Sequence, residues 1–158
     1  MTVRLVPATQ THFSRLLDGQ PPEPGMALPD TPVAGPEVLA MLAGLAAAVD
    51  EMFSPSAWLI MAGDELVGLM SVTSVLENGR LQIGYGVAPG AQGRGHASAA
   101  VAALVDWARR DARISALYAE TRTDNLASQR VLERGGFARI GERLDEEDGA
   151  LFCWQADC

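Results

Sequence analysis

The sequence predicts an α+β domain built on a mixed sheet. Three observations favour it: the order of strand-like and helix-like patterns along the 158 residues, a hairpin signal at Asn78–Gly79, and a glycine-rich stretch that joins a strand to an Ala-rich helix. A chain of this length suits one hydrophobic core, so we expect residues 1–158 to form a single domain.

The first third of the chain predicts one strand, two helices and a long loop between the helices. A short alternating strand covers residues 2–7, and Thr9 caps a helix that runs to about Leu17. Residues 18–37 hold six of the nine prolines, which predicts an extended loop that is functional or mobile. A second helix, with Pro36 in its first turn, ends near Phe53.

The remaining residues predict an antiparallel meander followed by alternating helices and strands. In order, these are strands over 57–63, 65–77 and 79–89, a helix over 95–112, a strand over 113–124, a helix over 125–136, and strands over 137–144 and 150–157. The resulting order, β α α β β β α β α β β, is that of an α+β protein with a mixed sheet.

Composition and charge limit the functions to consider. No apolar run reaches the ~18 residues of a membrane span, and the first residues lack the apolar core of a signal peptide. We therefore expect a cytoplasmic protein without a membrane partner. The net charge of −8 argues against nucleic acid as a partner and is compatible with a cationic acceptor such as an amine. Cys153 and Cys158 are expected to be reduced, and no metal is expected.

The stretch IGYGVAPGAQGRGHA, residues 83–97, holds five glycines between a strand and a helix. The first N–H groups of a helix have no partner within it, and the helix dipole adds partial positive charge there. Together they favour a phosphate group, which glycines allow to approach the backbone. The stretch is neither a Walker A motif nor a dinucleotide-binding GxGxxG motif. On its own it fits a plain flexible loop equally well.

Two further features favour a ligand site. Gly84 and Gly86 flank Tyr85 within the strand, and glycines inside a strand indicate a bulge or the close approach of a ligand. Asn125 and Ser128 stand at the start of the helix that follows the next strand. Asn is also a common helix-capping residue, so the informative point is the combination of both elements in one short chain.

These residues resemble the GNAT superfamily of N-acetyltransferases. Its acetyl-CoA motif, Gln/Arg-x-x-Gly-x-Gly/Ala, is matched by QGRGHA at residues 92–97. The preceding IGYGVAP and the later NLASQRVLERGGF are most similar to the RimJ/RimL-type branch, which acetylates protein N-termini and small amines. The resemblance implies a mostly antiparallel, twisted sheet with helices on both faces, in which the fourth and fifth strands splay apart.

The resemblance also implies a site for acetyl-CoA as a co-substrate. Backbone groups around Tyr85–Val87 would pair with the pantetheine arm, and the N–H groups of residues 93–98 would hold the pyrophosphate. The implied coenzyme-binding residues are Tyr85, Gly86, Val87, Gln92, Gly93, Arg94, Gly95, His96, Ala97, Ser98, Asn125, Ser128 and Arg130. For the outer phosphates, Arg94 ranks ahead of Arg130 and Arg134.

The implied reaction is direct attack of an amine on the thioester, which requires a proton acceptor and a proton donor. Many relatives place an acidic Tyr where this chain has Leu132, which cannot donate a proton. Ser128 is the first replacement, although it equally fits helix capping, and Tyr85 is another donor. Glu120 is a candidate base, and a chain of water molecules is an equal alternative. The backbone N–H of Val87 is expected to stabilise the oxyanion.

The leading hypothesis is therefore an acetyl-CoA-dependent N-acetyltransferase whose acceptor is a small amine or a protein N-terminus. The alternative is a catalytically silent regulatory module that binds acyl-CoA. The leucine at position 132 favours this alternative. A homodimer is common among proteins of this kind and is kept as a further expectation.

Overall fold

The computed structural model describes residues 3–158, so Thr2 of the predicted first strand lies outside the described residues. The element order is the predicted one. The strands are β1 (Val3–Pro7), β2 (Ala57–Ala62), β3 (Glu65–Val75), β4 (Arg80–Val87), β5 (Ala116–Arg122), β6 (Ala138–Asp145) and β7 (Gly149–Asp157). The helices are α1 (Gln10–Leu17), α2 (Pro36–Asp50), α3 (His96–Arg109) and α4 (Leu126–Arg134), with short 3₁₀ turns at Glu77–Gly79 and Pro89–Ala91.

Capping and turn residues fix several of these boundaries. The Thr9 hydroxyl accepts a hydrogen bond from the backbone N–H of His12, whose ring accepts one from the N–H of Thr9. Asn78 and Gly79 have φ angles of 62° and 76°, which the tight connection from β3 to β4 requires. The hairpin predicted from this pair of residues is therefore confirmed.

Several predicted elements run past their observed ends, including the helix over 95–112, which ends at Arg109, and the strand over 65–77, which ends at Val75. α2 ends at Asp50 rather than near Phe53, because Phe53 turns into the core and packs edge-on against Trp107, with ring centroids 6.3 Å apart. β5 begins at Ala116 rather than at residue 113, because Arg113 belongs to the preceding turn. The backbone N–H of Arg113 donates to the carboxylate of Asp111 over 3.0 Å.

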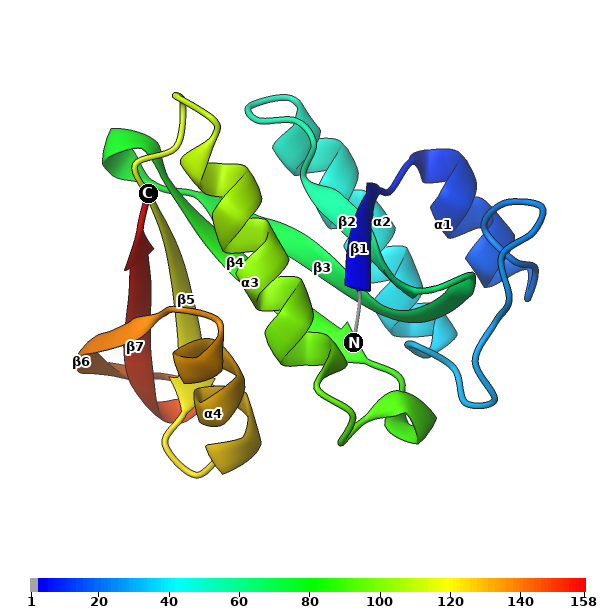
Figure 1. Cartoon of the computed structure of the whole chain (residues 1–158). Helices are drawn as coiled ribbons and strands as arrows, with labels where there is room; N and C mark the ends of the chain where they lie inside the picture. Colours follow the sequence, from blue (N-terminus) through cyan, green and yellow to red (C-terminus); the bar gives the residue numbers. More distant parts are fainter. Residues whose placement is uncertain (1–2) are drawn as a thin grey trace.

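A seven-stranded sheet of order β1-β2-β3-β4-β5-β7-β6 runs through the described chain (Figure 1). All neighbours are antiparallel except β4 and β5, which pair in parallel only over residues 80–82 and 116–118. Beyond that point β4 stays on β3, with Val87 beside Gly68, while β5 stays on β7, with Arg122 beside Leu151. The two strands therefore diverge, and the predicted splay is confirmed.

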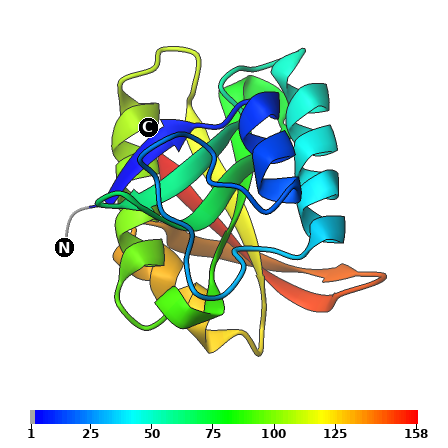
Figure 2. The same cartoon turned by 90° about the vertical axis from the view of Figure 1, so that its right-hand side faces the viewer.

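Helices cover both faces of the sheet. α3 and α4 lie on one face, and α1 and α2 on the other (Figure 1, Figure 2). The larger core cluster lies between α3, α4 and the sheet and includes Leu81, Val101, Leu104, Leu117, Leu132 and Trp154. A second cluster, with Phe13, Leu39, Leu59 and Leu69, joins α1 and α2 to the opposite face. Among the described residues, the helices are too short or too polar to cross a membrane.

Candidate active site

The divergence of β4 from β5 is accompanied by a cavity of about 610 Å³ between β4, the start of α3 and one side of α4. Its volume falls within the range of about 300–1,000 Å³ that is usual for ligand pockets. It is lined by Tyr85, Gly86, Val87, Ala91, Gln92, Gly93, Gly95, His96, Ala97, Ser98, Asn125, Ala127, Ser128, Arg130, Val131 and Arg134. We call it the large cavity.

The loop before α3 presents backbone N–H groups to the large cavity. Gly93 and Gly95 have φ angles of 78° and 79°, a left-handed conformation that side-chain-bearing residues rarely adopt. A Cβ atom on either glycine would meet nothing within 4 Å in the described protein. No side chain of residues 3–158 caps α3 at Gly95. The first N–H groups of α3 and the positive end of its dipole can therefore receive an anion.

His96 adds a buried polar atom to this corner. The residue lines the large cavity and is 6% exposed, and its Nδ1 atom has no hydrogen-bond partner among residues 3–158. A buried polar atom left unpaired costs about 1–3 kcal/mol, and such atoms are normally satisfied by protein, water or ligand. The corner therefore suits a ligand that carries a hydrogen-bonding group.

Tyr85 and Ser128 meet inside the large cavity, one from β4 and the other from α4. The Tyr85 hydroxyl lies 2.9 Å from the Ser128 Oγ and 3.4 Å from its carbonyl oxygen. Burial raises the pKa of the Tyr85 phenol above its ordinary value, and the hydrogen bond with Ser128 offsets part of that shift. The phenol is therefore neutral at physiological pH and has a proton to donate. Leu132, in contrast, is fully buried in the core.

The backbone of Val87 points toward the gap between the strands. The N–H of the next residue, Ala88, donates to the carbonyl of Val67 in β3 over 2.8 Å. Backbone groups alternate in direction along a strand, so the N–H and carbonyl of Val87 face away from β3. The Gln92 side chain donates to that carbonyl over 3.2 Å. The N–H of Val87 is left directed toward the space where a ligand between the strands would lie.

The polar start of α4 combines helix capping with cavity lining. The Asn125 side-chain oxygen accepts a hydrogen bond from the N–H of Ser128 over 3.1 Å, which caps the helix. Asn125 nevertheless lines the large cavity. Its capping role and its predicted contact with the coenzyme are compatible, because the cap uses only the amide oxygen.

The arginines differ from the predicted ranking. Arg130 and Arg134 line the large cavity and Arg94 does not, although all three residues are exposed. All the other predicted coenzyme-binding residues lie on the cavity wall. Sequence reasoning missed Ala91, Ala127 and Val131, which also line it. Helical spacing could have identified Ala127 and Val131, because positions 127, 131 and 134 share one face of α4.

Glu120 lies outside the large cavity, in a polar cluster that joins β4, β5 and β6. Its carboxylate accepts hydrogen bonds from Tyr118 (2.8 Å), Gln82 (3.3 Å) and both Nη2 (2.8 Å) and Nε of Arg143. These bonds, above all those from Arg143, hold the pKa of Glu120 below its ordinary value. A carboxylate of lowered pKa is a weak base, so this geometry does not favour the predicted role of Glu120 as a general base.

A smaller cavity of about 200 Å³ lies on the α2 face of the sheet. It is lined by Val33, Ala34, Val38, Leu42, Leu69, Ser71, Thr73, Gly84, Tyr85 and Gly86. Tyr85 and Gly86 also line the large cavity, so these two residues of β4 form a wall common to both cavities, beyond the residues that pair with β5. We call it the small cavity.

Several solved structures share this fold. One is RimL, a ribosomal L7/L12 α-N-protein acetyltransferase in complex with coenzyme A, with 22% identity and a TM-score of 0.74 over 99% of this chain and 94% of that chain. Another, from Salmonella typhimurium, modifies the N-terminal serine of L7/L12, with 20% identity and a TM-score of 0.75 over 100% of this chain and 96% of that chain. The aminoglycoside acetyltransferase AAC(6')-Ib with acetyl-CoA has 18% identity and a TM-score of 0.69 over 99% of this chain and 94% of that chain.

Sequence comparison assigns the family. A search of curated proteins finds no matching sequence. The family model described as an acetyltransferase (GNAT) domain matches residues 3–138, which include β4, α3, β5 and α4 and therefore the whole wall of the large cavity. The chain belongs to the GNAT family of acetyltransferases.

Proposed function

We propose that the chain transfers an acetyl group from acetyl-CoA to a primary amine by direct attack in a ternary complex. The observation that carries this proposal is that Tyr85 and Gly86 line both the large cavity and the small cavity. The start of α3 in the large cavity suits a phosphorylated ligand, and the small cavity lies against the same two residues on the α2 face of the sheet. Holding donor and acceptor on two sides of one gap supplies the proximity on which such a reaction depends.

The large cavity is proposed to hold acetyl-CoA, which supplies an activated thioester carbonyl when bound. The N–H groups of Gly93, Gly95 and the first turn of α3 would bind the pyrophosphate. Arg130 and Arg134, which line the cavity, replace Arg94 as the candidates for the outer phosphates. The backbone of Tyr85 and Val87 would pair with the pantetheine arm as a neighbouring strand does. Two of the structural neighbours contain coenzyme A or acetyl-CoA, which supports this assignment.

We assign the proton donor to Tyr85. During transfer the amine nitrogen bonds to the acetyl carbon and loses a proton, while the C–S bond breaks and the sulfur gains one. The Tyr85 phenol is neutral, lines both cavities and is held by Ser128, so it is placed to protonate the departing sulfur. Ser128 acts as a positioning residue. The N–H of Val87 faces the same gap and is assigned to the oxyanion.

The proton of the acceptor is proposed to leave through water rather than to Glu120. Glu120 is paired with Arg143 and lines neither cavity. Among residues 3–158, the polar side chains that line the small cavity are the hydroxyls of Ser71, Thr73 and Tyr85, none of which is a strong base. We therefore propose that the amine is already neutral when it attacks, and that turnover rises with the neutral fraction of the amine.

The acceptor is proposed to be a small amine or a peptide N-terminus, as the activities of RimL and AAC(6')-Ib suggest. The walls of the small cavity are mostly apolar and, within the described chain, bear no charged side chain. The net charge of −8 is therefore not matched by acidic side chains in the small cavity, where the amine would attack. The cytoplasmic location, the single-domain organisation and the homodimer stay predictions.

Thiol release from acetyl-CoA tests this function. The assay compares free amines and peptides with the same peptides carrying a blocked N-terminus. We expect release with free amines alone, and acetylated product by mass spectrometry. Tight binding of coenzyme A without thiol release on any amine would overturn the transferase proposal and support a silent acyl-CoA-binding module.

A further inference from the structure

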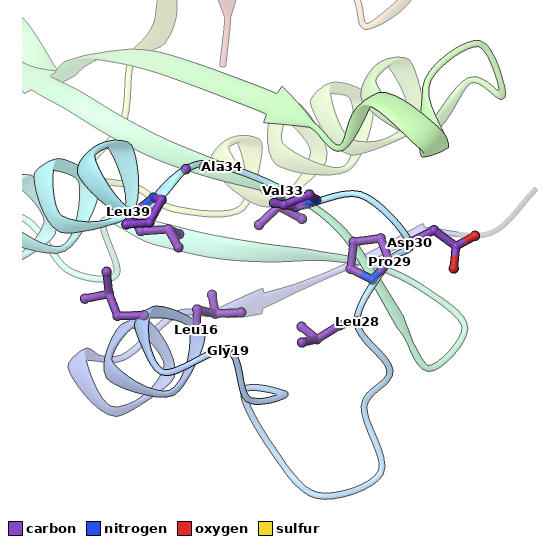
Figure 3. A pocket seen from close by; sticks show the side chains of 12 residues that line it. Leu16, Gly19, Leu28, Pro29, Asp30, Val33, Ala34 and Leu39 are labelled. Carbon is purple, nitrogen blue, oxygen red and sulfur yellow. The ribbon is translucent and has the colours of Figure 1, made fainter.

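A third cavity, of about 330 Å³, lies between α1, the proline-rich loop and the start of α2. It is lined by Leu16, Leu17, Gly19, Leu28, Pro29, Asp30, Pro32, Val33, Ala34, Gly35, Pro36 and Leu39. Figure 3 shows Leu28 and Val33 turned toward Leu16 across this space, while the carboxylate of Asp30 points away from it. We call it the apolar cavity, because no other charged side chain of the described residues lines it.

The apolar cavity and the small cavity share one wall. Val33 and Ala34 line both, and they are the last residues of the proline-rich loop before the helix-capping Gly35. Val33 also packs against both hydrophobic core clusters. The two cavities are therefore adjacent, with Val33 and Ala34 between them.

The loop that forms the apolar cavity is tied to the rest of the fold. Ala27 forms a bridge with Glu65 and exchanges backbone hydrogen bonds with Asp64 and Leu66, at 2.7 and 2.9 Å. The hydroxyl of Thr31 accepts a hydrogen bond from the N–H of Gly90, over 2.8 Å, in the turn that leads to the coenzyme-binding loop. The cavity is thus preformed, which lowers the entropic cost of filling it.

We propose that the apolar cavity binds the apolar end of the acceptor, whose amine lies in the small cavity beside Tyr85. This inference rests on the proposed function and narrows its acceptor to amines that carry an aliphatic or aromatic group. The volume of about 330 Å³ exceeds the ~150 Å³ of an apolar cavity that is known to bind benzene. Each methylene that enters should improve binding about fourfold, the factor that corresponds to its transfer from water.

Linear primary amines from butylamine to octylamine test this proposal, with 1,8-diaminooctane as a matched probe that ends in a second charge. Thiol release from acetyl-CoA gives kcat/KM for each amine. We expect kcat/KM to rise with chain length once the alkyl group reaches the cavity, and the diamine to fall at least about tenfold below octylamine because its second ammonium would be desolvated. A flat series, or a diamine equal to octylamine, would overturn the proposal.

Two variants locate the effect. Leu28 lines the apolar cavity and is 37% exposed, so Leu28→Trp should fill the space without disturbing the core. Met41 is 59% exposed and lines none of the three cavities, so Met41→Trp is the control. We expect Leu28→Trp to abolish the gain with chain length and Met41→Trp to preserve it. If Leu28→Trp does not fold, Leu28→Asp makes the same test by adding a charge. Equal chain-length dependence in both variants would sink the assignment.

Octylamine binding, measured by calorimetry, separates the cavity from the chemistry. Heat of binding in the wild type and Met41→Trp but not in Leu28→Trp, with no thiol release from any amine, would support the cavity while rejecting the transferase function. Transfer to butylamine with no binding gain for octylamine would reject the cavity while supporting the function.

Discussion

The hydroxyl of Tyr85 lies 2.9 Å from the Oγ of Ser128, across the gap where β4 and β5 part. This contact joins a strand to the first turn of the helix that follows the neighbouring strand. It places a neutral phenol on the wall that the two cavities share, whereas Leu132 of α4 is buried in the core and has no proton to donate.

Tyr85→Phe should lower kcat by about 10²-fold or more, the usual contribution of a general acid. The affinity for acetyl-CoA should stay nearly unchanged, because the backbone of residue 85 is kept. The chain has one other tyrosine, Tyr118, whose hydroxyl donates to Glu120 away from the large cavity. Tyr118→Phe is therefore the control, and it should retain most of its turnover. Similar kcat values for the two variants would remove Tyr85 as the acid.

Ser128→Ala should reduce kcat by less than Tyr85→Phe does and should weaken acetyl-CoA binding little. The pH dependence of its activity gives a more specific test. Burial raises the pKa of Tyr85, and the hydrogen bond between the Tyr85 and Ser128 hydroxyls lowers it in part. Without that bond the pKa of Tyr85 rises further, so the alkaline loss of activity should begin at higher pH in Ser128→Ala than in the wild type. A profile that is unmoved or shifted toward acid would contradict the positioning role.

His96→Leu should change stability and affinity in opposite directions. Replacing the unpaired Nδ1 removes a cost of about 1–3 kcal/mol in the absence of ligand, so Tm should rise by about 2–4 °C for each kcal/mol relieved. Affinity for acetyl-CoA should fall, because a group that the ligand would satisfy is gone.

His12→Leu is the matched control for that experiment. His12 is equally buried, but its ring accepts from the N–H of Thr9 over 3.0 Å and lies 2.8 Å from Glu23. Its replacement should lower Tm and leave acetyl-CoA affinity unchanged. If both histidine variants lose stability in the absence of ligand, the Nδ1 atom of His96 is not an unsatisfied group.

Glu120→Gln should lose stability at neutral pH but not in acid. The pKa of Glu120 is lowered in the folded protein, chiefly by Arg143. The folded state therefore binds fewer protons than the unfolded state near the ordinary glutamate pKa, and the stabilisation exists above that value and is lost as pH falls through the lowered pKa. Chemical unfolding of both proteins at several pH values gives the difference. If the difference in the free energy of unfolding between the two proteins stays constant down to acid pH, the ion pair is not the source of that difference.

The parts of the fold that follow local rules could be predicted from the sequence. Asn78–Gly79 specified a hairpin, Thr9 specified a helix start, and residues 92–97 specified a loop whose N–H groups lead into a helix. The splay of β4 and β5 followed from the family resemblance and is present.

Contacts between distant residues could not be predicted in the same way. Arg94 belongs to the motif yet does not line the cavity, while Arg134 at the end of α4 does, and this depends on where the fold places α4. Glu120 was predicted as a candidate base, but its carboxylate forms an ion pair with Arg143 on β6. Glu120 on β5 and Arg143 on β6 lie on strands that β7 separates in the sheet, so their contact depends on the strand order, which the pattern within either strand does not reveal.

Calorimetric titration with acetyl-CoA tests the central claim, that the large cavity holds this coenzyme on the N–H groups before α3. Gly95→Ile adds a branched side chain at a φ of 79°, and Gly63→Ile adds the same side chain at a φ of 62° in the turn between β2 and β3. Both changes should strain the backbone by about 1–2 kcal/mol. Only Gly95→Ile should weaken acetyl-CoA, by at least about tenfold, since one hydrogen bond to a charged group is worth about 1.5–3 kcal/mol. Equal acetyl-CoA affinity in Gly95→Ile, Gly63→Ile and the wild type, with all three folded, would contradict the account.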